Sequence, residues 1–216
     1  MINALIFTAA VGLLFTLLYF ARLERVAEGL CAKTALSCLF VVTALTQAHP
    51  VPSYYHAVIV GLILCAGGDV FLALPQRNMF LAGLVCFLVG HVCYLVGFLT
   101  ILHMSWAAWL GGIVFIVISI RVYFWLEPHL ESMKVPVILY ISVITLMAGG
   151  AWSILCDPRL PRTGRLLIFF GALLFYLSDV FVARNRFVKR EFLNRLLGLP
   201  LYYTGQFLLA FSVSAL

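Results

Sequence analysis

The sequence predicts an all-α membrane protein of about eight transmembrane helices, and its composition and hydropathy are the observations that predict it. Hydrophobic residues make up 64% of the 216 positions and charged residues only 10%, whereas soluble domains hold roughly 45–50% and 25%. A transmembrane helix needs roughly 20 mostly apolar residues. Eight segments approach or reach this length, near 2–20, 33–48, 55–74, 79–101, 105–124, 135–155, 165–183 and 193–215.

Short polar connections separate these segments, which predicts a single transmembrane domain over residues 1–216. None of the connections is long enough to hold a soluble domain, and the total length suits one domain. The first segment has no basic start and no clear cleavage site. It is therefore expected to stay as a helix rather than to be removed as a signal peptide.

The distribution of Lys and Arg predicts how the chain crosses the membrane. Of 14 such residues, eleven lie in or beside the connections after helices one, three, five and seven. The positive-inside rule places these connections in the cytoplasm. Both termini are then expected outside, in a protein of the bacterial inner membrane. The exceptions follow helix six and are Arg159, Arg162 and Arg165.

The net charge of +6 does not indicate nucleic-acid binding, because the basic residues lie in short connections between apolar helices. The six cysteines form no CxxC pair and no Cys/His metal spacing, so they are expected to be small apolar fillers. Two aspartates and one histidine on different helices are too unspecific to predict a metal site. No cofactor is expected, and the predicted partners are lipids and water.

Two acidic residues, Asp69 and Asp179, lie inside the apolar segments. A carboxylate in the hydrocarbon region costs roughly 2.5–3.5 kcal/mol and usually faces the bundle interior. Asp69 lies six residues before Pro75 and Asp179 lies five before Arg184, so both are expected roughly 8–9 Å from the cytoplasmic helix ends. Two neighbouring buried carboxyls do not readily ionise together. Such a pair suits acid–base hydrolysis and equally suits proton-coupled transport.

The same two aspartates begin an internal repeat, DVFLA at 69–73 and DVFVA at 179–183. The two segments are four helices apart, so they run in the same direction. A parallel four-plus-four repeat would relate them by an axis along the membrane normal. Coincidence over five residues is the alternative.

Other polar side chains are candidates to complete the site. His91 and Tyr94 are three residues apart and Tyr202 and Gln206 are four apart, so each pair shares a helix face. Each residue has a structural alternative, since hydrogen-bonded histidines and interfacial tyrosines also occur in membrane helices. The further candidates are Lys33, which otherwise snorkels to the interface, Tyr140, Ser178, and the basic run Arg184, Arg186, Lys189 and Arg190, which otherwise only marks the cytoplasmic side.

At these residues the chain resembles the YhhN-type lysoplasmalogenases, polytopic membrane hydrolases of the alkenyl-ether bond in lysoplasmalogens. The resemblance covers nearly the whole chain and departs at Thr34, where the family often has a proline after the lysine. The matching pieces, in chain order, are Lys33, Gly68-Asp69, Gly90-His91, Tyr94, Tyr140, Gly171-Ala172, Phe175, Ser178-Asp179, Arg186-Phe187, Tyr203 and Gln206.

The resemblance implies hydrolysis of the sn-1 vinyl ether of an alkenylglycerophosphocholine or -ethanolamine to a fatty aldehyde and a glycerophospho-headgroup alcohol. It also implies that Asp69 and Asp179 are catalytic. One is expected to protonate the vinyl ether and the other to stabilise the resulting cation and orient water, with the assignment open. The implied substrate-binding residues are Lys33, His91, Tyr94, Tyr140, Ser178, Arg186, Tyr203 and Gln206.

Other functions remain open. An intramembrane aspartyl protease also uses two aspartates, but Ala66 stands where its Gly-x-Gly-Asp motif begins, and its Tyr-Asp and Pro-Ala-Leu motifs are missing. A proton-coupled transporter fits the parallel repeat. A lipid-binding protein without turnover leaves the two costly carboxyls unexplained.

Overall fold

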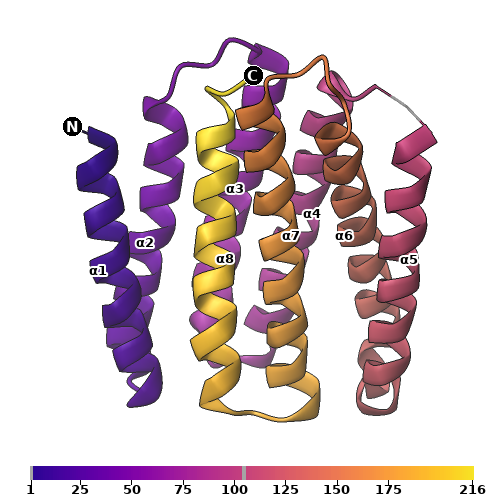
Figure 1. Cartoon of the computed structure of the whole chain (residues 1–216). Helices are drawn as coiled ribbons and strands as arrows, with labels where there is room; N and C mark the ends of the chain where they lie inside the picture. The colour runs from indigo at the N-terminus through magenta and orange to yellow at the C-terminus, as the bar shows by residue number, and fades with distance from the viewer. Residues whose placement is uncertain (1, 104–105) are drawn as a thin grey trace.

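The computed structural model describes residues 2–103 and 106–216, and its long elements are eight α-helices that run up and down in a bundle (Figure 1). Two short 3₁₀ turns, Glu127–His129 and Glu131–Met133, join α5 to α6, and a π-helical turn, Arg184–Val188, follows α7. The helices are α1 (Ile2–Arg22), α2 (Val26–Thr46), α3 (Pro52–Ala73), α4 (Arg77–Ile101), α5 (Trp106–Leu126), α6 (Lys134–Leu155), α7 (Arg162–Ala183) and α8 (Phe192–Ser212).

Seven of the described helices are long and apolar enough to cross a membrane, which confirms the predicted class, an all-helical polytopic membrane protein. The eighth, α8, is 21 residues long but less apolar. Most of its polar residues are buried, among them Asn194, Tyr202, Tyr203 and Gln206, whereas Thr204 is exposed. Because these groups face the protein interior rather than lipid, α8 runs alongside the other helices of the bundle although it is less apolar (Figure 1).

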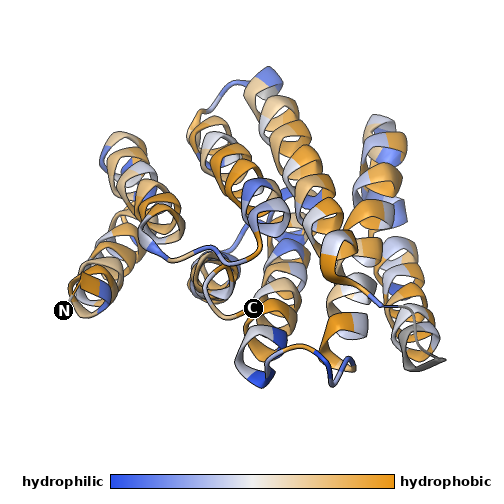
Figure 2. Cartoon of the chain, turned by 90° about the horizontal axis from the view of Figure 1, so that it is seen from above, coloured by the Kyte–Doolittle hydropathy of each residue, from blue (hydrophilic) through white to orange (hydrophobic). Residues whose placement is uncertain are grey.

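The surface and the interior have the distribution expected in a bilayer. Large apolar side chains such as Phe15 on α1 and Trp109 on α5 are more than two-thirds exposed, whereas Asp69, His91 and Gln206 are almost completely buried. Figure 2 shows hydrophobic residues along the helices and hydrophilic ones gathered mainly at helix ends and connections. Lipid is the solvent for the apolar surface, so the polar groups gather inside.

Helix α2 begins seven residues earlier than hydropathy predicts. The sequence places its start at Lys33, but the structure begins it at Val26. The first two turns contain Glu28 and Lys33 among good helix formers, and Arg25 just before the helix faces Glu28. An apolar window misses such an amphipathic start, and the longer helix carries Lys33 well inside the bundle.

The tightest helix pairs are built on matched glycines. A Cβ atom at Gly61 of α3 would lie 3.1 Å from the carbonyl oxygen of Gly90 on α4, and one at Gly171 of α7 would lie 3.1 Å from that of Gly205 on α8. Small residues of this kind let membrane helices approach closely. Gly61 and Gly171 each lie eight residues before the aspartate of their helix, so close packing fixes both aspartates at corresponding positions.

Most of the remaining helix contacts follow the same four-helix offset. Helix α3 packs on α2 and α4, as α7 packs on α6 and α8; α4 also packs on α6, as α8 packs on α2. This is the pattern that a parallel four-plus-four repeat produces, and it agrees with the DVFLA and DVFVA segments.

Candidate active site

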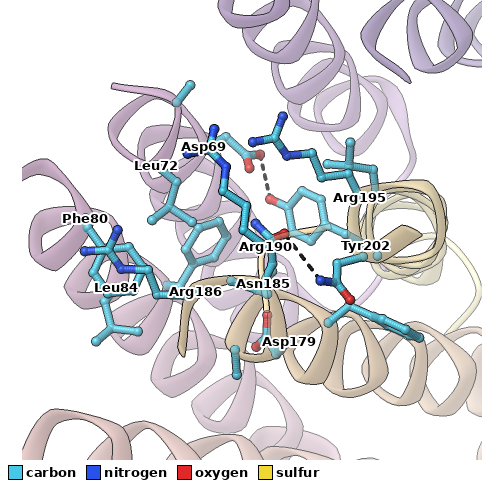
Figure 3. A pocket seen from close by; sticks show the side chains of 18 of the residues that line it. Asp69, Leu72, Phe80, Leu84, Asp179, Asn185, Arg186, Arg190, Arg195 and Tyr202 are labelled. Atoms are coloured by element: carbon cyan, nitrogen blue, oxygen red, sulfur yellow. Dashed lines mark hydrogen bonds between the residues drawn. The ribbon is translucent and has the colours of Figure 1, made fainter. Parts of the chain in front are cut away.

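A cavity of about 660 Å³ penetrates the bundle from the end opposite to both chain termini (Figure 1). Residues of the α1–α2, α3–α4 and α7–α8 connections line its mouth. Asp69 and Asp179 both line it, and in Figure 3 they lie on different sides of the pocket. A volume of this size falls within the range of roughly 300–1,000 Å³ of small-molecule sites.

The carboxylate of Asp69 is held by a lysine and two hydroxyls. The Lys33 ammonium lies 2.9 Å from Oδ1, and Ser37 and Tyr202 donate hydrogen bonds of 2.6 and 2.7 Å to Oδ2. The Asp69 side chain is 2% exposed. A carboxylate that receives a cation and two hydroxyl donors is stabilised in its ionised form.

Asp179 has a different environment. The Tyr140 hydroxyl donates a 2.7 Å hydrogen bond to Oδ2, and Nε2 of His91 lies 3.7 Å from the same oxygen. Among the described residues no group bonds to Oδ1 of Asp179, and the side chain is 16% exposed. This carboxyl therefore has one neutral donor and one oxygen left for a ligand in the cavity.

The tautomer of His91 follows from the hydrogen bond that its Nδ1 atom makes. Nδ1 lies 2.6 Å from the carbonyl oxygen of Phe87. Because a carbonyl only accepts, Nδ1 carries a hydrogen, and in the neutral ring Nε2 is an acceptor. That acceptor faces Asp179 and has no hydrogen-bond partner in the described part of the chain. A protonated Asp179 is the partner that would satisfy it.

The two aspartate environments come from repeat-related helices but differ in chemistry. Asp69 on α3 is held from α2 and α8, and Asp179 on α7 is held from α6 and α4. These helices correspond under the four-helix offset. One side supplies Lys33 and hydroxyls, whereas the other supplies Tyr140 and a neutral histidine. One duplicated scaffold thus presents one carboxyl suited to be ionised and one suited to carry a proton.

A second layer of polar groups lies behind the carboxyls. Tyr203 shares a 3.2 Å hydrogen bond with Ser37, and Tyr94 donates a 2.7 Å hydrogen bond to Oε1 of Gln206. Ser178 donates to the carbonyl of Phe175 within its own helix. Nε2 of Gln206 is buried without a partner among the described residues. These groups connect and support the cavity wall rather than line it.

The cavity has an apolar arm and a basic mouth. The apolar arm is formed by α5 and α6, and the mouth is rimmed by arginines and a lysine from the α1–α2 connection, the π-helical turn and α8. The apolar arm consists of Val122, Leu126, Val137, Ile141 and Ile144, and the basic mouth of Arg25, Arg186, Lys189, Arg190 and Arg195. The site thus combines a polar centre, an apolar arm and a cationic rim, the layout that suits a single-chain phospholipid.

Half of the predicted site residues line this cavity: Lys33, Asp69, Tyr140, Asp179 and Arg186. The other five, His91, Tyr94, Ser178, Tyr203 and Gln206, lie behind the wall. The sequence did not single out Ser37 and offered Tyr202 only through its spacing with Gln206. The signal for Ser37 is its position four residues after Lys33, which puts both on one face of α2. No group of three metal-binding side chains occurs among the described residues.

Comparison with known proteins identifies the family of the chain. A family model described as the YhhN family matches residues 29–213. The chain is 29% identical over 168 residues to the lysoplasmalogenase TMEM86A of Bos taurus, covering 72% of this chain and 64% of that protein. It is 31% identical over 178 residues to the lysoplasmalogenase TMEM86A of Homo sapiens, covering 76% and 67%. The chain thus spans about two thirds of the length of these relatives. No solved structure matches it.

Proposed function

The chain belongs to the YhhN family, and from this premise we propose that it is a lysoplasmalogenase that hydrolyses the sn-1 vinyl ether of a lysoplasmalogen. Relatives about 30% identical carry that activity in their names. A buried carboxyl pair in a cavity with an apolar arm and a basic mouth supports the same substrate class. The products are a fatty aldehyde and a glycerophospho-headgroup alcohol.

The observation that carries the mechanism is the contrast between the two carboxyls. Asp69 receives Lys33 and two hydroxyls on both of its oxygens, whereas Asp179 receives only Tyr140 and faces the acceptor nitrogen of His91. Asp179 is therefore the general acid, and Asp69 is the ionised carboxylate that stabilises positive charge. His91 and Tyr140 position Asp179, as Ser37 and Tyr202 position Asp69.

In the first step Asp179 donates its proton to the β-carbon of the vinyl ether. The carbon–carbon double bond becomes a single bond, and the positive charge spreads over the α-carbon and the ether oxygen as an oxocarbenium ion. A nearby fixed carboxylate lowers the energy of this cation most effectively in a site from which water is largely excluded. Asp69, with a 2% exposed side chain, fulfils that condition.

In the second step water adds to the α-carbon and gives up a proton to Asp69, which produces a neutral hemiacetal. The hemiacetal then collapses: its hydroxyl proton returns to Asp179, and the proton on Asp69 moves to the departing glycerol oxygen. Both carboxyls end in their starting states, so no co-reactant other than water is needed.

The shape and charge of the cavity also indicate the orientation of the bound substrate. The alkenyl chain lies in the apolar arm, the ether beside the aspartates and the headgroup in the basic mouth. The second layer, Tyr94, Ser178, Tyr203 and Gln206, holds the wall against which water and the glycerol are positioned. By the positive-inside rule the basic mouth faces the cytoplasmic leaflet, with both termini outside, and a bacterial inner membrane is the proposed location.

The direct test measures aldehyde release from a lysoplasmenylethanolamine by the detergent-purified protein. General acid catalysis contributes typically 10²–10⁴-fold, so Asp179→Asn is expected to lower kcat by about this factor, and Asp69→Asn by a similar one. The matched control is Asp157→Asn, which changes the third aspartate of the chain, located in the connection between α6 and α7 at the opposite end. Near-full activity of a folded Asp179→Asn protein contradicts the mechanism.

The position of protonation is tested separately in D₂O. Protonation at the β-carbon places one deuterium on the carbon next to the aldehyde, and immediate reduction to the alcohol preserves it for mass spectrometry. Product without deuterium at that carbon contradicts protonation of the vinyl ether.

A second candidate is proton-coupled transport, which the repeat in helix packing favours. The two functions give opposite results in proteoliposomes. Aldehyde production without a proton gradient supports the hydrolase, and gradient-dependent solute uptake without aldehyde supports the transporter.

A further inference from the structure

The six basic residues that line the cavity divide into two groups. Lys33 pairs with Asp69, Lys189 with Glu191 and Arg25 with Glu28. Arg186, Arg190 and Arg195 have no acidic side chain within ion-pair distance in the described part of the chain. Hydrogen bonds from Lys189 and Arg184 hold the pKa of Glu191 below its ordinary value, so this neighbouring carboxylate is already committed to other cations.

The contacts of these three arginines hold the side chains in place but include no ion pair among the described residues. The Arg186 guanidinium carbon lies 4.1 Å from the centre of the Phe80 ring, and Arg195 donates a 3.3 Å hydrogen bond to the carbonyl of Ala21. The described residues give Arg190 no hydrogen bond or ion pair. In Figure 3, Arg190 and Arg195 point toward the same end of the pocket, and Arg186 lies on its other side against Phe80.

Two of these cations also repel each other. The charge of Arg190 acts against that of Arg195, which is half-buried on α8, whereas the charge of Glu24 acts in favour of it. Like charges held together in a partly apolar setting favour a bound anion that relieves their repulsion. The planar guanidinium fork fits the oxygens of a phosphate particularly well.

The π-helical turn explains how the cations come together. An α-helix that ran on from α7 would continue its 3.6-residue spacing, but Lys189 donates its backbone hydrogen bond to Arg184, five residues back. Such turns are frequent at functional sites. This one places Arg186 and Arg190 at the mouth while Arg195 enters from the first turn of α8.

An acidic group completes the mouth. Glu24, in the connection between α1 and α2, is the one acidic side chain other than the two aspartates among the described residues that line the cavity. It has a positive φ of 56°, which is uncommon for a residue with a side chain. The cations and Glu24 together match a zwitterion that carries a phosphate and an ammonium group.

We infer that Arg186, Arg190 and Arg195 bind the phosphodiester of the substrate and that Glu24 faces the ammonium group of its headgroup. This inference rests on the proposed hydrolase. It also removes Lys33 from the phosphate site, since its ammonium is committed to Asp69. The phosphodiester and the ammonium group should then give a zwitterionic lysophospholipid a lower KM than an alkenylglycerol with the same chain.

The test compares two substrates, a lysoplasmenylethanolamine and a 1-alkenylglycerol with the same chain but no phosphate. Arg190→Gln and Arg195→Gln are each expected to raise KM for the phospholipid about tenfold or more, with kcat nearly unchanged. The alkenylglycerol should show the same kcat/KM in both variants as in the unaltered protein. The control is Arg162→Gln, an exposed arginine at the opposite end of the bundle.

The two substrates distinguish a failure of the hydrolase proposal from a failure of the proposed phosphate site. If the unaltered protein cleaves neither substrate, the hydrolase proposal fails. If it cleaves both and the arginine variants lose activity equally on both, the arginines have a structural role and the phosphate site is wrong. Unchanged kinetics on the phospholipid overturn the inference in the same way.

The headgroup assignment is tested by a further variant and by two inhibitors. Glu24→Gln should raise KM for lysoplasmenylethanolamine but not for the corresponding alkenylglycerophosphate, which lacks the amine, and Glu131→Gln is the control. Glycerophosphoethanolamine should inhibit competitively, and inorganic phosphate at the same concentration should inhibit less. Equal inhibition by the two compounds would identify a free-phosphate site and overturn the headgroup assignment.

Discussion

The ammonium nitrogen of Lys33 lies 2.9 Å from Oδ1 of Asp69, between side chains that are only 14% and 2% exposed. The positive charge of the pair comes from the amphipathic start of α2 and the negative charge from a position about one turn before the end of α3. A lysine that hydropathy places at the membrane interface thus pairs with one of the two aspartates that line the cavity. The pair forms within the protein itself and requires no ligand.

This pair predicts a specific pattern of stability. Removal of one partner leaves the other charge buried and unpaired, which costs about 3–5 kcal/mol, whereas replacement of both by neutral groups is often nearly neutral. Lys33→Met is therefore expected to lower the thermal unfolding midpoint in detergent strongly, and Lys33→Met/Asp69→Asn to recover most of it. Aldehyde release should stay lost in the double variant. A double variant no more stable than Lys33→Met contradicts the pairing.

The adjacent tyrosines of α8 are predicted to differ in activity. Tyr202 donates directly to Asp69 and lines the cavity, whereas Tyr203 reaches Ser37 one step away. A hydrogen bond to a charged group is worth roughly 1.5–3 kcal/mol, so Tyr202→Phe is expected to lower kcat about 10–100-fold and Tyr203→Phe much less. Steady-state kinetics of the two phenylalanine variants make this comparison. A larger loss in Tyr203→Phe would contradict this prediction. It would indicate that Tyr203, the tyrosine that matches the family motif, contributes more to activity than Tyr202.

The tyrosine pair also shows what the sequence can and cannot predict. Apolar segments and the polar breaks between them predict the eight helices, because the bilayer thickness fixes how long the helices must be. The cost of a buried charge singles out Asp69 and Asp179. Which of two neighbouring tyrosines faces a carboxyl depends on the rotation of α8 against α3, and that rotation is set by packing with distant segments.

Which of the two carboxyls has which character was equally beyond the sequence. The sequence predicts a matched pair, and the repeat makes the pair look symmetrical. The asymmetry comes from α2 and α4, which supply Lys33 and His91 from more than 30 and more than 80 positions away from the aspartates that they contact. Only the packing of the helices reveals these long-range contacts.

The apolar arm predicts control of chain length. Ile141 on α6 lines the arm, and Ile138, one turn earlier, is 43% exposed on the outer surface. Ile141→Trp fills the arm and is expected to lower kcat/KM for an 18-carbon alkenyl substrate about tenfold relative to a 10-carbon one, since each methylene is worth roughly 0.8 kcal/mol when buried. Ile138→Trp is the control and should leave the ratio unchanged. An unchanged ratio in Ile141→Trp would place the chain elsewhere.

The glycine contact between α7 and α8 predicts a stability effect that needs no assumption about function. A Cβ atom at Gly205 would lie 2.8 Å from the carbonyl oxygen of Gly171 and 3.1 Å from the backbone nitrogen of Phe175, whereas one at Gly12 of α1 meets nothing within 4 Å. Overpacking of this kind costs typically 1–3 kcal/mol, and neither backbone atom can move without shifting a helix. Gly205→Ala is therefore expected to lower the thermal unfolding midpoint in detergent. Gly12→Ala should leave it unchanged or raise it slightly, because alanine favours the helix. Equal midpoints for the two variants would show that α7 and α8 do not meet at these glycines, and that the aspartate of α7 is held by other contacts.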